Sequence, residues 1–318
     1  MSIVPYLLLI VAFFLLAKGA DYFIDGASGL AEYFRVSPLF IGLTIAAIGT
    51  SAPEAAVSIN ATLTEVGGIS LGNVVGSNIA NVCVAIGIAA CLKPLTFESS
   101  TIKKEMPFML VITALMLIFS LDFANTNTSV ITRVEGLIFL ALFVVYLFYL
   151  SRMAINDRKI SIAKAGNKKP SIIRSILLTL LGVAGIILGG DLAVDNAVKV
   201  AEFWGVSDKV IGISIVAFGT SVPEIVTTIV AVVKGKVPIA IGNIVGSNIF
   251  NILLVLGITA TVRPVRLPSD VVFDGAICLA VGALFFLLSK VSKQFYRVQG
   301  LSFLIIYILY ISLLFIRG

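Results

Sequence analysis

The chain has 318 residues, of which 59% are hydrophobic and only 13% are charged, and its mean hydropathy is +1.10. A soluble domain needs far more polar surface, so this composition predicts an integral membrane protein. The formal net charge is +6, and the basic residues gather between apolar runs, which favours a topological role over binding to nucleic acid. The sequence contains no histidine, which excludes imidazole metal ligands and histidine proton relays.

Apolar runs of about 17 to 25 residues can each cross the hydrocarbon core of a bilayer as a helix. Ten such runs follow one another, so we expect an all-α integral membrane protein with ten transmembrane helices. The predicted spans are residues 3–23, 39–63, 69–92, 106–121, 133–151, 173–193, 209–233, 238–262, 271–289 and 299–316. The first run lacks a basic leader and a clear cleavage site, so we expect it to be retained as a span.

An internal repeat relates the two halves of the chain. Residues 19–94 align without a gap with residues 189–264, and about 32 of roughly 76 positions are identical. "GTSAPE" at 49–54 matches "GTSVPE" at 219–224, and "GNVVGSNIAN" at 72–81 matches "GNIVGSNIFN" at 242–251. Five spans per copy is an odd number, so we expect two five-helix repeats of inverted topology, an arrangement common among transporters.

The predicted organisation is a first repeat at 1–150, a basic cytoplasmic linker at 151–172 and a second repeat at 173–318. Most basic residues fall in this linker or in loops on the same side, so the positive-inside rule predicts both termini outside and the central loop inside. Arg263 and Arg266 fall on the opposite side and are exceptions. We expect a multi-pass plasma-membrane protein surrounded by lipid, with no nucleic acid and no obligatory protein partner.

A glutamate ends each of the two GTS-containing motifs, in the middle of an apolar run where an unpaired charge costs several kcal/mol. No lysine or arginine lies near Glu54 or Glu224 in the same spans. An inverted repeat brings the two carboxylates together near the bilayer midplane, where a bound cation would balance their charge. Pro53 and Pro223 lack an N–H and break their helices, which frees backbone carbonyl groups to face a cavity.

Hydroxyl groups at Thr50, Ser51, Thr220 and Ser221 add further oxygen atoms next to the helix breaks. Hard cations such as Ca²⁺ take about six to eight oxygen ligands, from carboxylates, carbonyls and water. The motif offers oxygen only, which disfavours soft transition metals. The residues therefore predict a site for a hard cation.

A polar stripe runs along the third and eighth spans, because residues four apart lie on one face of a helix. Its members are Asn73, Ser77 and Asn81 in the first repeat and Asn243, Ser247 and Asn251 in the second. We expect Ser77, Asn81, Ser247 and Asn251 to face the glutamates. For Asn73 and Asn243 the alternative is that they only join helices by hydrogen bonds.

Four further acidic residues lie near the ends of the first and sixth predicted spans. They are Asp21, Asp25, Asp191 and Asp195. A charge at the membrane interface is inexpensive, so we expect these aspartates to be solvated or to cap neighbouring helices.

The paired motifs resemble the alpha-repeats of the calcium/cation antiporter superfamily, and its prokaryotic sodium/calcium exchanger branch is the most similar. The resemblance covers essentially the whole chain. It implies that Glu54 and Glu224 chelate Ca²⁺ and that the backbone carbonyls of Thr50 and Thr220 complete the calcium site. It further implies flanking Na⁺ sites and a central polar pair. One Na⁺ site matches Ala47, Ser51 and Ser247, the other matches Ala217, Ser221 and Ser77, and the central pair is Asn81 and Asn251.

The resemblance also implies a secondary antiporter that exchanges Ca²⁺ for Na⁺ by alternating access, with no cofactor. Potassium-dependent relatives typically have aspartate at the position of Asn251, so the amide indicates that K⁺ is not transported. Antiport of Ca²⁺ against H⁺ is the alternative, since two protons also neutralise two glutamates.

Enzyme and channel functions are disfavoured by the residues. An aspartyl hydrolase would use a pair of aspartates, and a lipid phosphatase would need arginines near its acids. A passive cation channel would use a ring contributed by several subunits, whereas two inverted copies within one chain are typical of transporters.

Overall fold

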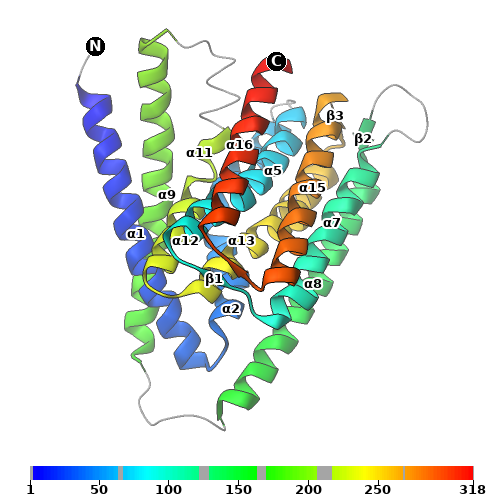
Figure 1. Cartoon of the computed structure of the whole chain (residues 1–318). Helices are drawn as coiled ribbons and strands as arrows, with labels where there is room; N and C mark the ends of the chain where they lie inside the picture. The colour runs from blue at the N-terminus through cyan, green and yellow to red at the C-terminus, as the bar shows by residue number, and fades with distance from the viewer. Residues whose placement is uncertain are drawn as a thin grey trace.

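The structure is a computed structural model that describes residues 3–63, 67–121, 129–162, 170–205, 217–267 and 269–317. These residues are almost wholly helical, and most of the long helices run alongside one another between two ends of the molecule (Figure 1). The helical elements, with η for π-helical segments, are α1 (Val4–Phe34), α2 (Pro38–Ile41), η1 (Gly42–Ala46), α3 (Ala47–Thr50), α4 (Ala52–Leu63), α5 (Gly67–Ala80), η2 (Asn81–Ile86), α6 (Gly87–Leu92), η3 (Thr101–Glu105), α7 (Met106–Phe119), α8 (Arg133–Ile162), α9 (Ile172–Phe203), α11 (Ala217–Gly219), α12 (Val222–Val233), α13 (Val237–Phe250), η5 (Asn251–Leu256), α14 (Gly257–Val262), α15 (Ser269–Ser292) and α16 (Arg297–Arg317).

Seven helices in the described part of the chain are long and apolar enough to cross a membrane. An eighth crossing is counted when the bent pair Pro38–Thr50 and Ala52–Leu63 is taken as one span. The α12 helix, with 12 residues, is too short to cross alone, and the segment before it, 206–216, lies outside the described residues. The predicted helical membrane architecture is confirmed, and the number of ten spans stays a prediction.

Several helices extend beyond the spans that the sequence predicts. The first span was expected to end at residue 23, but α1 continues to Phe34, and α8 continues past residue 151 to Ile162. Hydropathy marks only the part of a helix that lies in hydrocarbon, whereas the backbone hydrogen bonds of a helix continue into water. Polar residues at 151–162 therefore belong to a helix that extends out of the predicted membrane region.

Asp21 and Asp25 lie inside α1, and both side chains are partly exposed, as expected, but they also form ion pairs that the sequence did not predict. The Lys234 ammonium group, just after α12, lies 2.5 Å from a carboxylate oxygen of Asp21 and 2.7 Å from one of Asp25. Partial burial opposes the positive charge, but hydrogen bonds to both aspartates outweigh it and raise the pKa of Lys234 above its ordinary value. This ion-pair cluster joins a helix of the first half to a helix end of the second.

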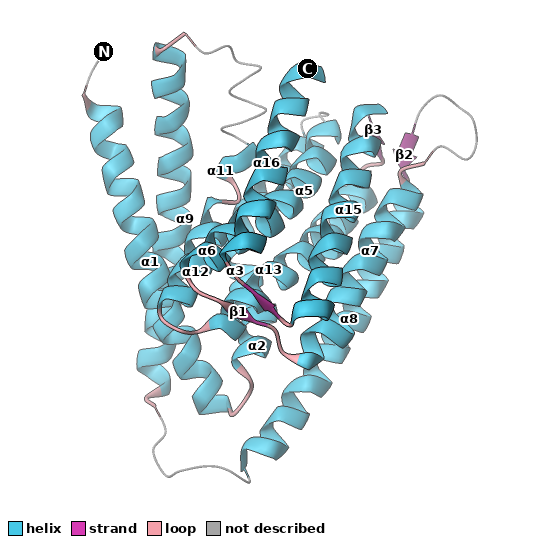
Figure 2. Cartoon of the chain, in the orientation of Figure 1, coloured by secondary structure: helices cyan, strands magenta, loops and turns pink. Residues whose placement is uncertain are grey.

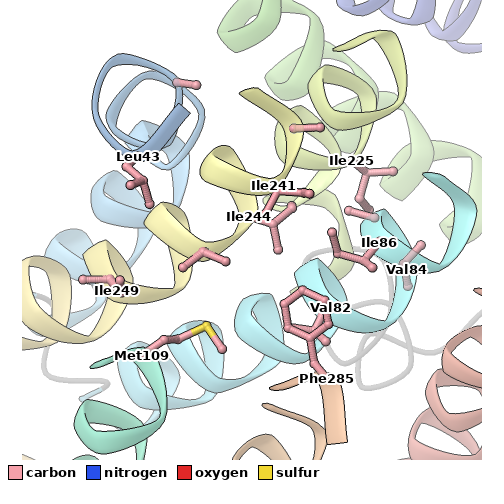
Figure 3. Packing of buried hydrophobic residues seen from close by; sticks show 14 of the residues in the cluster. Leu43, Val82, Val84, Ile86, Met109, Ile225, Ile241, Ile244, Ile249 and Phe285 are labelled. Carbon is pink, nitrogen blue, oxygen red and sulfur yellow. The ribbon is translucent and has the colours of Figure 1, made fainter. Parts of the chain in front are cut away.

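The centre of the molecule is formed by the third and eighth predicted spans. Within the apolar windows of these spans, 83% of the residues of Ser70–Leu92 and 94% of those of Val237–Val262 are buried, against 17% for Arg297–Arg317. Figure 3 shows side chains from both halves in this core, among them Ile86 and Ile244. Polar groups in the two central spans are thus shielded from lipid by the surrounding helices.

The α13 helix approaches the segment α2–η1 closely because glycines face each other. A Cβ atom on Gly242 would lie 2.7 Å from the Leu39 carbonyl oxygen and 2.9 Å from the Cα atom of Gly42. Small residues at such crossings let membrane helices pack backbone to backbone. The contact brings the Asn243–Asn251 stripe against the helix that contains the first GTS motif.

Two short antiparallel ribbons join the halves. Strand β1 (Leu95–Thr96) pairs with β4 (Gln294–Phe295), and β2 (Ser129–Ile131) pairs with β3 (Val265–Leu267). The β2–β3 ribbon lies near the end that holds both termini, and β1–β4 lies towards the other end (Figure 2). Each ribbon contains one strand from each half, at opposite ends of the helices, as an inverted repeat would produce.

Candidate cation-binding site

Both GTS motifs lie at a break between two helices. In the first half, α3 ends at Thr50 and α4 begins at Ala52, with a bend of 46° between the two segments of the span. Residues Ser51 (φ −83°, ψ 9°) and Ser221 (φ −86°, ψ −2°) have nearly the same backbone conformation at the two breaks. Because Pro53 has no N–H, the Gly49 carbonyl has no backbone donor four residues later, and the predicted helix break is confirmed.

Glu54 and Glu224 lie in the first turns of α4 and α12, and both are fully buried. The carboxylates lie close enough for their charges to repel each other. Among the described residues, no lysine or arginine forms an ion pair with either of them. The positive ends of the two helix dipoles offset part of this charge, and the remainder favours a cation.

The two carboxylates differ in their hydrogen bonds. Glu224 Oε1 accepts from the Ser51 hydroxyl at 2.9 Å and from the Ser247 hydroxyl at 3.4 Å. Both carboxylate oxygens of Glu54, by contrast, are buried without a hydrogen-bond partner among the described residues, as are the hydroxyls of Ser77 and Ser221. Glu224 Oε2 is likewise buried without a partner among the described residues, and because unmet buried acceptors are costly, both carboxylates have oxygens that a bound cation would satisfy.

Asn73 and Asn243 join the two halves through the GTS threonines. The Thr50 hydroxyl donates to Asn243 Oδ1 at 3.1 Å, and the Thr220 hydroxyl donates to Asn73 Oδ1 at 3.2 Å. The Asn73 amide also donates to the Glu54 backbone carbonyl at 3.2 Å. These asparagines therefore fix the position of both broken helices, which agrees with the expected alternative that they join helices.

Asn81 and Asn251 are fully buried at the first residue of η2 and of η5, two matching π-helical segments. Single π-helical turns are frequent at functional sites because they reorient side chains. Each amide NH₂ group donates to an asparagine of the other half, whereas each Oδ1 atom has no hydrogen-bond partner among the described residues. Both side chains therefore offer a free acceptor in the buried centre.

The structure buries most of the predicted residues and joins many of them by hydrogen bonds between the two halves. Their hydrogen bonds form separate groups: Thr50 with Asn243; Ser51 and Ser247 with Glu224; Thr220 with Asn73, which also bonds the Glu54 carbonyl; and Asn81 with Asn248. Ala47 is buried, and its carbonyl accepts from the Ser51 N–H at 3.1 Å. Ala217 is the first residue of α11, and the structure does not describe its side chain.

The sequence-based reasoning did not single out Asn78 and Asn248, although both are part of the repeated motifs. They are 2% and 3% exposed and bond to the central pair. Asn78 does not belong to the stripe, whose members are four residues apart. The sequence "GSN", which is identical in both motif copies, is a signal that could have identified it.

Comparisons with known proteins agree on one family. The family described as sodium/calcium exchanger protein matches residues 4–152 and 174–316. The sodium/calcium exchanger MaX1 of Methanosarcina acetivorans is 31% identical over 352 residues, which cover 99% of each chain. The inner membrane protein YrbG of Escherichia coli is 34% identical over 289 residues, covering 88% of this chain and 87% of YrbG.

A solved structure is similar over nearly the full length. It is that of the sodium-calcium exchanger NCX_Mj soaked with zero Na⁺ and Ca²⁺, at 31% identity and a TM-score of 0.85. The match covers 98% of this chain and 99% of that one.

Proposed function

The chain belongs to the sodium/calcium exchanger family, and from this premise we propose that it is an antiporter that exchanges Ca²⁺ for Na⁺ across the membrane. One observation supports this most directly. Two fully buried carboxylates, Glu54 and Glu224, face each other from broken helices in an environment of oxygen atoms, with no ion pair from the described lysines and arginines. Such a site suits a hard divalent cation. The family comprises transporters, so the chain is not an enzyme.

Glu54 and Glu224 bind Ca²⁺ in this proposal, and the backbone carbonyls of Thr50 and Thr220 complete the site. The threonine hydroxyls already donate to Asn243 and Asn73, which holds the broken helix ends in place without using the carbonyls. The proposed Na⁺ ligands lie on either side. They are Ala47, Ser51 and Ser247 for one ion and Ala217, Ser221 and Ser77 for the other.

Exchange follows from charge compensation. An empty site has two ionised carboxylates, and moving that uncompensated charge through a low-dielectric intermediate is costly. One Ca²⁺ neutralises the pair, and Na⁺ ions also do so. Only the loaded transporter then changes its access from one side to the other, which couples the two fluxes and prevents a leak.

We propose that K⁺ takes no part, because Asn251 contributes a neutral amide where an aspartate would add a charge. The Asn251 amide donates its proton to Asn78 Oδ1 at 3.1 Å, a bond that an ionised aspartate is unable to form. The site therefore has two carboxylates to neutralise rather than three.

The proposed architecture is ten spans in two inverted repeats, with the termini outside and the central loop in the cytoplasm. Two features support it. The C-terminal end of α8 and the start of α9 lie at the opposite end of the molecule from both termini (Figure 1). Arg152 and Arg158, both exposed, lie in the C-terminal part of α8, and Arg174, also exposed, lies at the start of α9, as the positive-inside rule requires of a cytoplasmic face.

The test is uptake of radioactive Ca²⁺ into sealed proteoliposomes loaded with Na⁺ and diluted into Na⁺-free buffer. The purified protein is tested with and without a pH gradient, and with and without K⁺. We expect uptake that requires internal Na⁺ and is unaffected by pH or K⁺. Uptake driven by the pH gradient alone would instead assign the chain to Ca²⁺/H⁺ antiport.

Charge-neutral variants test the site itself. Glu54→Gln and Glu224→Gln keep the side-chain shape but remove one charge each, so we expect loss of Ca²⁺ uptake by at least about 100-fold, given the strength of carboxylate–calcium bonds. The melting temperature should not fall, because each change relieves a buried repulsion. Glu135→Gln, at a partly exposed position in the first turn of α8, is the control and should transport normally. Normal uptake by either site variant would refute the assignment.

A further inference from the structure

Four asparagines form a reciprocal cluster where the two central spans cross. Asn78 and Asn81 come from the first half, and Asn248 and Asn251 come from the second at the matching positions of the repeat. All four side chains are buried, with exposed fractions of 3% or less. Each bond in the cluster has a counterpart related by the inverted repeat.

The hydrogen bonds of Asn78 and Asn248 determine which way their own amides point. Asn78 Nδ2 donates to the Asn248 backbone carbonyl at 3.2 Å, and Asn248 Nδ2 donates to the Asn78 backbone carbonyl at 3.3 Å. Because each NH₂ group is used on a backbone oxygen, each Oδ1 atom faces the other way, towards the central pair. A backbone carbonyl only accepts hydrogen bonds, so neither amide can flip without losing this bond.

The central amides are oriented in turn. Asn81 Nδ2 donates to Asn248 Oδ1 at 3.0 Å, and Asn251 Nδ2 donates to Asn78 Oδ1 at 3.1 Å. The NH₂ group of each central amide is thereby held by an asparagine of the opposite half. Its Oδ1 atom lies on the opposite side of the amide and remains buried with no partner among the described residues.

Helix packing places the central asparagines beside the segments that contain the two glutamates. The η2 segment that begins with Asn81 packs against α12, which has Glu224 in its first turn, and η5 packs against α4, which has Glu54. An amide that points its oxygen at this space attracts a cation, whereas a flipped amide would present two N–H groups and repel it. The difference between the two orientations is therefore a difference in cation affinity.

We infer that Asn78 and Asn248 are positioning residues that turn the Asn81 and Asn251 amide oxygens towards the transported cation. The inference rests on the proposed function, since it assigns an orienting role within the proposed ion site. Neither residue touches the ion in this account. Each acts through the central asparagine of the opposite repeat, so that each half of the protein orients a ligand of the other half.

The test compares Ca²⁺ affinity in two backgrounds, measured from the rise in melting temperature of the purified full-length protein as Ca²⁺ is added. Asn78→Ala removes the acceptor that holds the Asn251 amide, so we expect the apparent dissociation constant to rise about 10-fold, the usual effect of one lost buried hydrogen bond. Asn196→Ala is the matched control. It removes a buried amide in α9 that bonds only to the Leu192 carbonyl at 2.7 Å, and its affinity should be unchanged.

The second background is Asn251→Asp, whose carboxylate has an acceptor in either orientation and therefore needs no orienting partner. We expect Asn78→Ala to have little further effect on Ca²⁺ affinity in this background. An unchanged affinity in Asn78→Ala alone, or an equal loss in both backgrounds, would overturn the inference, because a purely structural role would act equally in both. The mirrored pair, Asn248→Ala with Asn81→Asp, gives the same comparison if one Asp variant is unstable.

The binding measurement separates this inference from the proposed exchange reaction. If the wild-type protein binds Ca²⁺ but its uptake does not depend on Na⁺, the proposed coupling fails and the orienting role is still tested. If uptake requires Na⁺ but Asn78→Ala binds Ca²⁺ normally, the coupling stands and the orienting role is refuted.

Discussion

At the scale of single residues, the two halves of the site have matching sequences but different hydrogen bonds. Glu224 accepts from Ser51 and Ser247, whereas the oxygens of Glu54 have no partner among the described residues. A transporter built from inverted repeats exchanges the environments of its halves when access changes sides. In the proposed exchanger, the unequal bonds would belong to one of two access states, and the roles of the two glutamates would reverse in the other.

Ser51→Ala tests the role of the first of these hydroxyls. Because the Ser51 hydroxyl donates its proton to Glu224, the lone pairs of its oxygen are available to the proposed Na⁺. We expect the Na⁺ concentration for half-maximal Ca²⁺ uptake to rise about three- to tenfold, which corresponds to one lost hydroxyl ligand or hydrogen bond. Ser302→Ala removes an exposed hydroxyl in α16 and serves as the control. An unchanged Na⁺ dependence in Ser51→Ala would contradict the predicted Na⁺ site.

At the scale of helical elements, the break before each glutamate exposes the backbone carbonyls that the proposed site uses. Pro53→Ala restores an N–H four residues after Gly49, so that a continuous helix becomes possible and the carbonyl is satisfied internally. We expect Ca²⁺ uptake to fall at least about tenfold while the melting temperature stays level or rises, since a helix-interior proline costs about 3 kcal/mol.

A second proline provides the control for this experiment. Pro38 is the first residue of α2, where the N–H of a helix has no partner within the helix, so Pro38→Ala should change neither stability nor uptake appreciably. Full uptake by Pro53→Ala would show that the break is unnecessary for transport.

The elements also show how far a sequence determines the structure. The apolar runs, the repeat and the proline breaks were predictable, because each depends on composition or on neighbours within a few residues. The Lys234 cluster with Asp21 and Asp25 was not, since these residues are more than 200 positions apart in sequence and meet only after the halves pack. The proposed orienting role of Asn78 was not predictable either, because its hydrogen-bond partner Asn251 lies 173 positions away in sequence and meets it only after the halves pack.

At the scale of the whole molecule, the proposed inversion would place the corresponding loops of the two halves on opposite sides of the membrane. The β2–β3 ribbon contains Arg266 at the end with the termini, so this basic residue opposes the charge bias, as Arg263 does. The linker end has many more basic residues. Since orientation depends on the difference between the two ends and not on single charges, the termini should still face outward.

Labelling of single cysteines at the two ends of α8 tests this orientation. In a background with alanine at Cys83, Cys91 and Cys278, a cysteine is introduced at Thr132 or at Asn156, both of which are exposed. We expect a membrane-impermeant maleimide to label Thr132→Cys in intact cells and Asn156→Cys only after permeabilisation. The reverse pattern would invert the proposed topology. Labelling of both from the same side would show that α8, despite its 30 residues, does not cross the membrane.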